Sequence, residues 1–262
     1  MALHLIDSHC HLDSGDFDAD RETILQLCQQ RGISTIIVPG VTAATWQRLL
    51  TLCGQYPALI PALGLHPIYL DQHHDSDITL LEQHMDDKSV IAVGEIGLDY
   101  YLDTLDRTHQ QRLFEAQLCV ARNIALPVIL HVRKAHEQVL STLQRIKPRG
   151  GIVHAFNGSY EQALRYIALG FKLGFGGMLT YARSTKLREL ARRLPLDAIV
   201  LESDAPDMVV ASHRGERNSP AYLIDSLASL AAIRATDPHT IAAQTTRNCC
   251  NVLGLAPRAP SC

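Results

Sequence analysis

Two histidines lie close together in the stretch Leu5-Ile-Asp-Ser-His-Cys-His11, at the end of a short apolar segment. Side chains alternate between the two faces of a strand, so Asp7, His9 and His11 are expected to point one way and Cys10 the other. Two imidazoles on one face can bind a single metal ion. Taken alone, the pair is equally compatible with two polar residues on a solvated strand end.

Later apolar segments also end in residues that can bind a metal. These residues are Glu95, His131, His154 and Asp204. Each has a simpler explanation: an acid in a solvated loop, a hydrogen-bonded core histidine, or an acid that caps a turn before Pro206. A chance coincidence at the ends of five separate strands is improbable. The whole set therefore favours metal binding.

Six such side chains exceed the ligand number of one tetrahedral zinc ion, which is about four. They suit two ions roughly 3.5–4 Å apart that share a carboxylate and a water. The order of the residues along the chain suggests Glu95 as the bridging carboxylate. Imidazole ligands favour zinc or manganese over magnesium alone. We therefore expect two divalent ions, with zinc as the bound metal and magnesium or manganese able to support activity.

The elements that must position these side chains form a regular alternation. We predict strands at 5–11, 33–38, 58–63, 90–95, 126–131, 151–154, 171–175 and 198–202. We predict helices at 18–31, 43–55, 78–85, 105–123, 137–146, 160–169, 186–193, 223–234 and 240–253. Alternation of strand and helix predicts a parallel α/β sheet, and eight units predict a closed (β/α)8 TIM barrel with its site at the C-terminal ends of the strands. A doubly wound open sheet is the alternative, but no glycine-rich phosphate loop follows the first strand.

Length and composition limit the function classes. The chain has 262 residues, 47% of them hydrophobic, which fits one domain over residues 1–262. A net charge of −3 argues against non-specific duplex binding through a broad basic field. Seven cysteines without a C-x-x-C pair argue against a disulfide framework and favour a reducing compartment. Without a signal-peptide pattern or an apolar stretch of ~18 residues, we expect a cytoplasmic protein with no membrane partner and no evident obligate protein partner.

Over nearly its whole length, the sequence resembles the TatD family of metal-dependent deoxyribonucleases, within the amidohydrolase-like barrel hydrolases. The motifs that carry the resemblance are Asp7-Ser-His-Cys-His11, Gly94-Glu-Ile-Gly-Leu-Asp-Tyr100, Leu126-Pro-Val-Ile-Leu-His-Val-Arg133, Gly151-Ile-Val-His-Ala-Phe-Asn-Gly158, Leu201-Glu-Ser-Asp204 and Arg214-Gly-Glu-Arg-Asn-Ser-Pro220. The resemblance implies one ion held by His9, His11, Glu95 and Asp204, and a second held by Glu95, His131 and His154. It also implies phosphodiester hydrolysis of the 3′–5′ exonuclease kind.

The sequence departs from the family pattern at three places. Lys134 stands where the family usually has an acid, Ala155-Phe-Asn-Gly158 replaces Cys-Phe-Thr-Gly, and Ala205-Pro206-Asp207 replaces Ser-Pro-Tyr. None of the three is a predicted ligand, and all lie near the expected position of the substrate. The departures therefore weaken the inference about the substrate and leave the inference about the metal ions unchanged.

Other residues near the strand ends are candidates for substrate binding. Arg133 offers a planar fork of donors to a phosphate oxygen, or forms a surface ion pair. Tyr100 closes the pocket or packs, and His66 contacts substrate or is structural. Arg214 and Arg217 can hold neighbouring phosphates.

We expect hydrolysis of DNA, at exposed ends or in single strands, or of another phosphodiester. Glu95 and Asp204 are the expected catalytic residues, and Asp204 can accept a proton from the attacking water. An amidohydrolase, lactonase or phosphotriesterase acting on a small molecule is the alternative enzyme. A non-catalytic binding module is a third class, and turnover of a generic phosphodiester by purified protein separates it from the enzymes.

Overall fold

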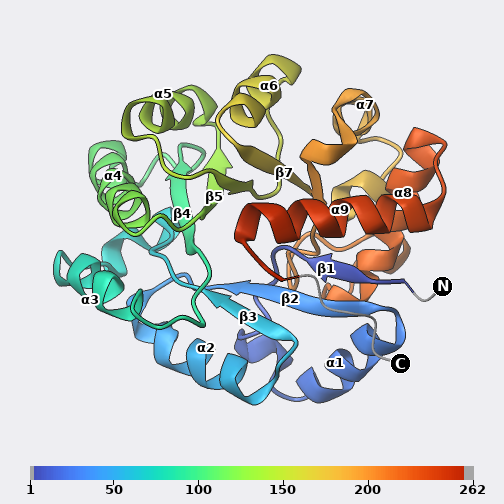
Figure 1. The fold of residues 1–262 in the computed structure, drawn as a ribbon, viewed down its shortest axis with the longest axis horizontal. Coiled ribbons are helices and arrows are strands. Elements are labelled where there is room, and N and C mark those ends of the chain that lie inside the picture. The colour runs from blue at the N-terminus through green and yellow to red at the C-terminus, as the bar shows by residue number, and fades with distance from the viewer. Residues whose placement is uncertain (1–2, 257–262) are drawn as a thin grey trace. The chain divides into compact units, whose positions relative to one another are not determined.

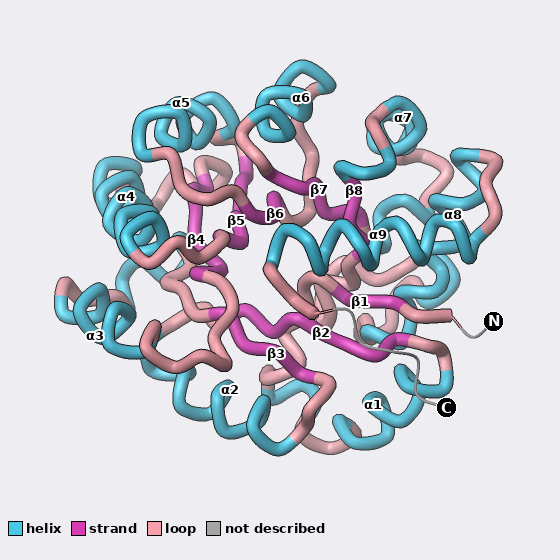
Figure 2. The backbone as a smooth tube through the Cα atoms, in the orientation of Figure 1, coloured by secondary structure: helices cyan, strands magenta, loops and turns pink. Residues whose placement is uncertain are grey.

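The computed structural model describes residues 3–256 and divides into two units. The terminal unit comprises Met1–Val38 and Lys172–Cys262, and the central unit comprises Pro39–Phe171. Their elements are labelled in Figure 1 and coloured by secondary structure in Figure 2. A single domain over the whole chain stays a prediction. Within residues 3–256, no helix combines the length and the apolar character needed to cross a membrane.

The strands of the terminal unit run parallel in pairs. They are β1 (Leu5–Asp7), β2 (Ile33–Pro39), β7 (Phe171–Phe175) and β8 (Ile199–Leu201). β1 pairs with β2 and β7 pairs with β8. Backbone hydrogen bonds from Ser8 to Leu201 (3.0 Å) and from Asp204 to His9 (2.9 Å) then join the end of β8 to the end of β1. The segments that carry the predicted ligands of this unit are therefore hydrogen-bonded to each other.

The helices of the terminal unit begin and end at recognisable signals. They are α1 (Arg21–Gln30), α7 (Thr185–Arg193), α8 (Leu223–Arg234) and α9 (Pro238–Leu253). α9 begins after Asp237, whose side chain accepts a hydrogen bond from the backbone of Thr240. Pro238 occupies the first helical position, where no N–H is needed. Gly254 ends the helix in a left-handed conformation.

The strands of the central unit are also parallel. They are β3 (Leu59–Ala62), β4 (Val93–Asp99), β5 (Val128–Arg133) and β6 (Gly151–Val153). β4 pairs with β5, and β5 pairs with β6. A bridge between Leu63 and Val93 connects the end of β3 to β4. Every residue of β4 is buried, as expected for a strand covered on both faces.

The central unit has five α-helices: α2 (Ala43–Gln55), α3 (Ser76–His84), α4 (Arg107–Asn123), α5 (His136–Ile146) and α6 (Tyr160–Ala168). Figure 1 shows α4 and α5 beside β4 and β5. α6 begins with a reciprocal capping box between Ser159 and Gln162. Short 3₁₀ helices lie at Gly15–Phe17, Pro67–Gln72, Gly177–Thr180, Leu196–Ala198, Ala211–His213 and Pro220–Tyr222.

The prediction for the fourth strand was wrong in its bounds. We predicted 90–95, with Glu95 at the end, but β4 runs from Val93 to Asp99 and places Glu95 inside the strand. The strand continues through Gly97 because this residue pairs with His131 of β5. A Cβ atom at Gly97 would lie 1.9 Å from the His131 carbonyl oxygen, and φ is +151°. Glycine here permits close approach of two strands rather than ending one.

Gly97→Ala is expected to lower the melting temperature. The left-handed backbone costs about 1–3 kcal/mol for a residue with a side chain, and each kcal/mol corresponds to roughly 2–4 °C in a chain of this size. Thermal unfolding followed by circular dichroism measures the change. Gly54→Ala is the matched control, because Gly54 lies in α2 with nothing within 4 Å of its added Cβ. If both variants melt at the wild-type temperature, β4 and β5 do not approach as described.

Candidate metal centre

In the terminal unit, His9, His11 and Asp204 direct their side chains at one another. The Nε2 atoms of His9 and His11 lie 3.2 Å apart. Oδ1 of Asp204 lies 3.6 Å from Nε2 of His9 and 3.9 Å from Nε2 of His11. Donor atoms bound about 2.1 Å from one ion are separated by roughly 3–3.5 Å. The three donors therefore have nearly the spacing of ligands to a single ion.

Asp7 fixes the backbone from which these side chains extend. Its Oδ1 atom accepts hydrogen bonds from the backbone N–H groups of His9 (3.2 Å) and Ser203 (2.9 Å). Burial raises the pKa of Asp7 to about 7. The segments after β1 and after β8 thus share one buried carboxyl group.

Asn218 performs a similar task for the loop that carries Asp204. Its Nδ2 atom donates to the carbonyl oxygens of Ser203 (2.8 Å) and Asp207 (2.6 Å). Its own N–H donates to the carbonyl of Pro206 at 3.0 Å. Asp204 itself has φ of +57°. The sequence analysis included Asn218 in a motif but did not predict this supporting role. The role depends on contacts with residues 11 and 15 positions away in the sequence.

In the central unit, one carboxylate oxygen is surrounded by imidazoles. Oε1 of Glu95 lies 3.1 Å from Nδ1 of His131, 3.2 Å from Nε2 of His66 and 3.5 Å from Nε2 of His154. The Glu95 side chain is only 2% exposed. Donor atoms of His66, Glu95 and His131 all lie within 4.8 Å of one another, a spacing that can hold a metal ion.

The tautomer of His66 follows from its neighbours. Its Nδ1 atom accepts a hydrogen bond from the backbone N–H of Ile68 at 3.1 Å. A neutral ring then carries its proton on Nε2 and donates it to Glu95. In this arrangement, His66 holds the Glu95 carboxylate in place, which is the structural alternative of the two that the sequence left open; contact with substrate stays a prediction.

Asp99 orients the ring of His131. Its Oδ2 atom lies 3.0 Å from Nε2 of His131, on the opposite side of the ring from Glu95. Burial alone would lower the pKa of His131, but hydrogen bonds to Asp99 and Glu95 outweigh it and raise the pKa. When Asp99 accepts the Nε2 proton, Nδ1 of a neutral ring keeps a lone pair for a metal. Sequence reasoning missed Asp99, although it ends the same strand as Glu95.

Asp99→Asn is expected to weaken metal binding by about 10–100-fold, the usual cost of losing the group that orients a ligating histidine. Competition with a chromophoric chelator measures the affinity without any assay of turnover. Asp103→Asn is the matched control, because Asp103 is exposed and pairs with Arg107. Unchanged affinity in Asp99→Asn would show that the Asp99 contact does not prepare His131 for a metal.

Both sets of donors fit a divalent transition metal. Imidazole nitrogens and carboxylate oxygens are the common protein ligands of zinc and related ions. The first set is His9, His11 and Asp204, and the second is Glu95, His131 and His154 with His66 beside them. Each set is nearly buried yet partly reachable, since the side chains of His11 and His131 are 20% and 17% exposed.

The predicted substrate-binding residues have different surroundings. The half-buried Tyr100 lies under Arg107, and Arg133 is exposed at the end of β5. Arg214 is exposed after the 3₁₀ helix Ala211–His213. Arg217 forms a bidentate ion pair with Asp20 and lies over the ring of Phe17. Its guanidinium is therefore already paired with a carboxylate.

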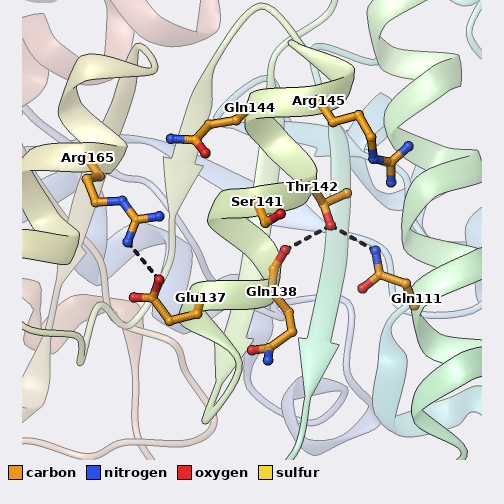
Figure 3. A pocket seen from close by; sticks show the side chains of 8 residues that line it. All are labelled: Gln111, Glu137, Gln138, Ser141, Thr142, Gln144, Arg145 and Arg165. Atoms are coloured by element: carbon orange, nitrogen blue, oxygen red, sulfur yellow. Dashed lines mark hydrogen bonds and ion pairs between the residues drawn. The ribbon is translucent and has the colours of Figure 1, made fainter.

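A polar hollow of about 610 Å³ lies elsewhere in the central unit. Figure 3 shows the side chains that line it, from α4, α5 and α6. They are Gln111, Glu137, Gln138, Ser141, Thr142, Gln144, Arg145 and Arg165. None of them is a predicted ligand, and they are tied to one another by contacts such as the ion pair between Arg165 and Glu137 at 2.7 Å. The hollow lies on the open surface of these helices and includes none of the predicted metal ligands.

Comparison with known proteins identifies relatives over the whole chain. The family model described as TatD related DNase matches residues 6–254. An Escherichia coli K12 protein named as an uncharacterized metal-dependent hydrolase, YjjV, is 41% identical over 95% of this chain and 97% of its own length. A Haemophilus influenzae protein, also named an uncharacterized metal-dependent hydrolase, is 36% identical over 95% and 99%.

The crystal structure of YjjV, described as a TatD homologue, superimposes with a TM-score of 0.94. It is 39% identical, and the match covers 98% of this chain and 100% of that one. The predicted fold class, α/β with parallel strands in a (β/α)8 barrel, is confirmed by this match.

Proposed function

Because the chain belongs to the TatD related DNase family, we propose that this metal-dependent hydrolase cleaves phosphodiester bonds of DNA. The observation that supports the proposal most is the pair of donor sets, one in each unit. Free ends or single strands are the proposed substrates, because a chain of net charge −3 offers no broad track for a duplex. An exonuclease mode and a cytoplasmic location belong to the same proposal.

Two divalent ions are proposed as cofactors. His9, His11 and Asp204 would hold one, and His131 and His154 the other. The sequence-based prediction that Glu95 is shared by both ions is part of the proposal. When bound, such ions lower the pKa of a water and neutralise charge on the phosphoryl oxygens. Zinc is the proposed resident metal, and magnesium or manganese would support activity.

The side chains have distinct proposed tasks. Asp204 accepts the proton of the attacking water, because its carboxylate is partly exposed and lies beside the imidazoles of His9 and His11. His66 holds Glu95 in one orientation through a contact of 3.2 Å. Arg133 binds a phosphate oxygen of the substrate. Tyr100, Arg214 and Arg217 stay candidates for substrate contacts, with Arg217 the least accessible to a ligand because of Asp20.

A substrate screen with metal-replete protein tests the proposal. We expect turnover of phosphodiesters and much weaker turnover of phosphotriesters, lactones and amides. The screen includes bis(4-nitrophenyl) phosphate and a single-stranded oligonucleotide. Efficient turnover of a lactone or phosphotriester with none of any phosphodiester would move the assignment to the small-molecule hydrolases.

A further inference from the structure

Two cationic side chains converge on one exposed aromatic ring just beyond the end of β5. The guanidinium carbon of Arg133 lies 3.7 Å from the centre of the Tyr101 ring. Nζ of Lys134 lies 4.7 Å from the same centre. Tyr101 is 48% exposed, so much of its surface is open to a ligand. We call these three residues the Tyr101 cluster.

The cluster is held beside the predicted metal ligand His131. Asp99 of β4 is opposite Arg133 of β5, and the N–H of Tyr100 donates to the Arg133 carbonyl at 2.8 Å. The N–H of Tyr101 donates to Oδ1 of Asp99 at 2.8 Å, while Oδ2 of the same carboxylate contacts His131. One buried carboxylate thus fixes both the metal-binding ring and the backbone of the Tyr101 cluster.

The cluster carries two positively charged side chains, those of Arg133 and Lys134. Across the described residues 3–256, no carboxylate forms an ion pair with Arg133 or Lys134, whereas the nearby Arg107 pairs with Asp103 at 3.3 Å. The two cations lie within about 10 Å of each other, the Debye length in ~0.1 M salt, so each feels the other. A bound anion would relieve this repulsion, and the guanidinium can grip two phosphate oxygens at once.

We propose that the Tyr101 cluster is a nucleotide subsite. An unpaired base stacks on the Tyr101 ring or on the guanidinium plane over it, and Arg133 and Lys134 contact the adjoining phosphate. The chemistry favours a single strand, because the faces of the bases in a duplex are covered by their neighbours. The proposal rests on the proposed phosphodiesterase function and adds a binding site next to the reacting bond.

Binding of a fluorescent twelve-nucleotide oligothymidylate with a phosphorothioate backbone tests the subsite. The metal-loaded protein is titrated at several salt concentrations and followed by fluorescence anisotropy. Tyr101→Ala is expected to raise Kd by about 5–10-fold, as loss of a stacked base does, and Tyr101→Phe to retain wild-type affinity. Lys134→Gln is expected to raise Kd by roughly 3–10-fold and to reduce the slope of log K against log salt by about 0.7.

Lys147→Gln is the matched control for Lys134→Gln. Lys134 and Lys147 are exposed lysines that flank opposite ends of α5, with φ of +53° and +56°. The control should bind the oligonucleotide as the wild type does. If Lys134→Gln and Tyr101→Ala also keep wild-type affinity and salt dependence, the subsite is overturned.

An abasic chain of the same length separates the base from the phosphate. Tyr101→Ala should leave its affinity unchanged, and an equal loss on both chains would overturn the stacking. Wild-type turnover of bis(4-nitrophenyl) phosphate, measured in parallel, tests the proposed function alone. Failure of that turnover with intact oligonucleotide binding would reject phosphodiester hydrolysis and not the subsite.

Discussion

Replacing Glu95 with glutamine is expected to reduce phosphodiester hydrolysis by at least two to three orders of magnitude, on the order of 10²–10³ for a lost electrostatic element. Three imidazole nitrogens lie within 3.5 Å of its Oε1 atom, so the carboxylate is the negative centre of the ligand set in the central unit. An amide has nearly the same shape but no charge to offer a cation. The loss should therefore appear in kcat and in metal content together.

Glu137→Gln is the control for this substitution. Glu137 is an exposed acid of the same unit, and its carboxylate pairs with Arg165. It is not a proposed metal ligand. It should retain wild-type activity and metal content. Steady-state kinetics and elemental analysis of the folded variants give the comparison. A Glu95→Gln protein with unimpaired activity would reject the role of Glu95 as a ligand.

Asp204→Asn should have the second largest effect, a loss of about 10²–10⁴-fold in kcat, the usual contribution of a positioned acid or base. The variant keeps the size of the side chain but can neither accept a proton nor supply negative charge beside His9 and His11. Asp197→Asn is the control, since Asp197 is an exposed acid of the same unit in the 3₁₀ helix Leu196–Ala198. Equal rates for Asp204→Asn and wild type across the pH range would exclude Asp204 as the base.

Much of the site could be predicted because strand-end residues repeat a simple pattern. His9, His11 and Asp204 follow short buried strands, and neighbouring strand ends bring such residues together. The helices at Ala43–Gln55 and Leu223–Arg234 and the strand at Phe171–Phe175 have the predicted bounds. In these segments, the spacing of the apolar residues and the residues that flank each element indicate the same bounds.

The remainder depends on contacts that the sequence does not display. Asp99 reaches His131 only because Gly97 lets β4 continue in register with β5. Likewise, His136 is buried, and its ring nitrogens contact Tyr166 and Asn157. Such partners are far apart in sequence and are defined by packing, so residue type alone could not identify them.

The most direct test of metal-dependent DNA hydrolysis follows cleavage of end-labelled single-stranded and duplex DNA by the wild-type protein, before and after chelation and with metals added back. We expect chelation to abolish cleavage and zinc, manganese or magnesium to restore it, with the single strand cut faster than the duplex. Cleavage that persists after complete metal removal, or no cleavage of either DNA by metal-replete protein that turns over small esters, would contradict the account.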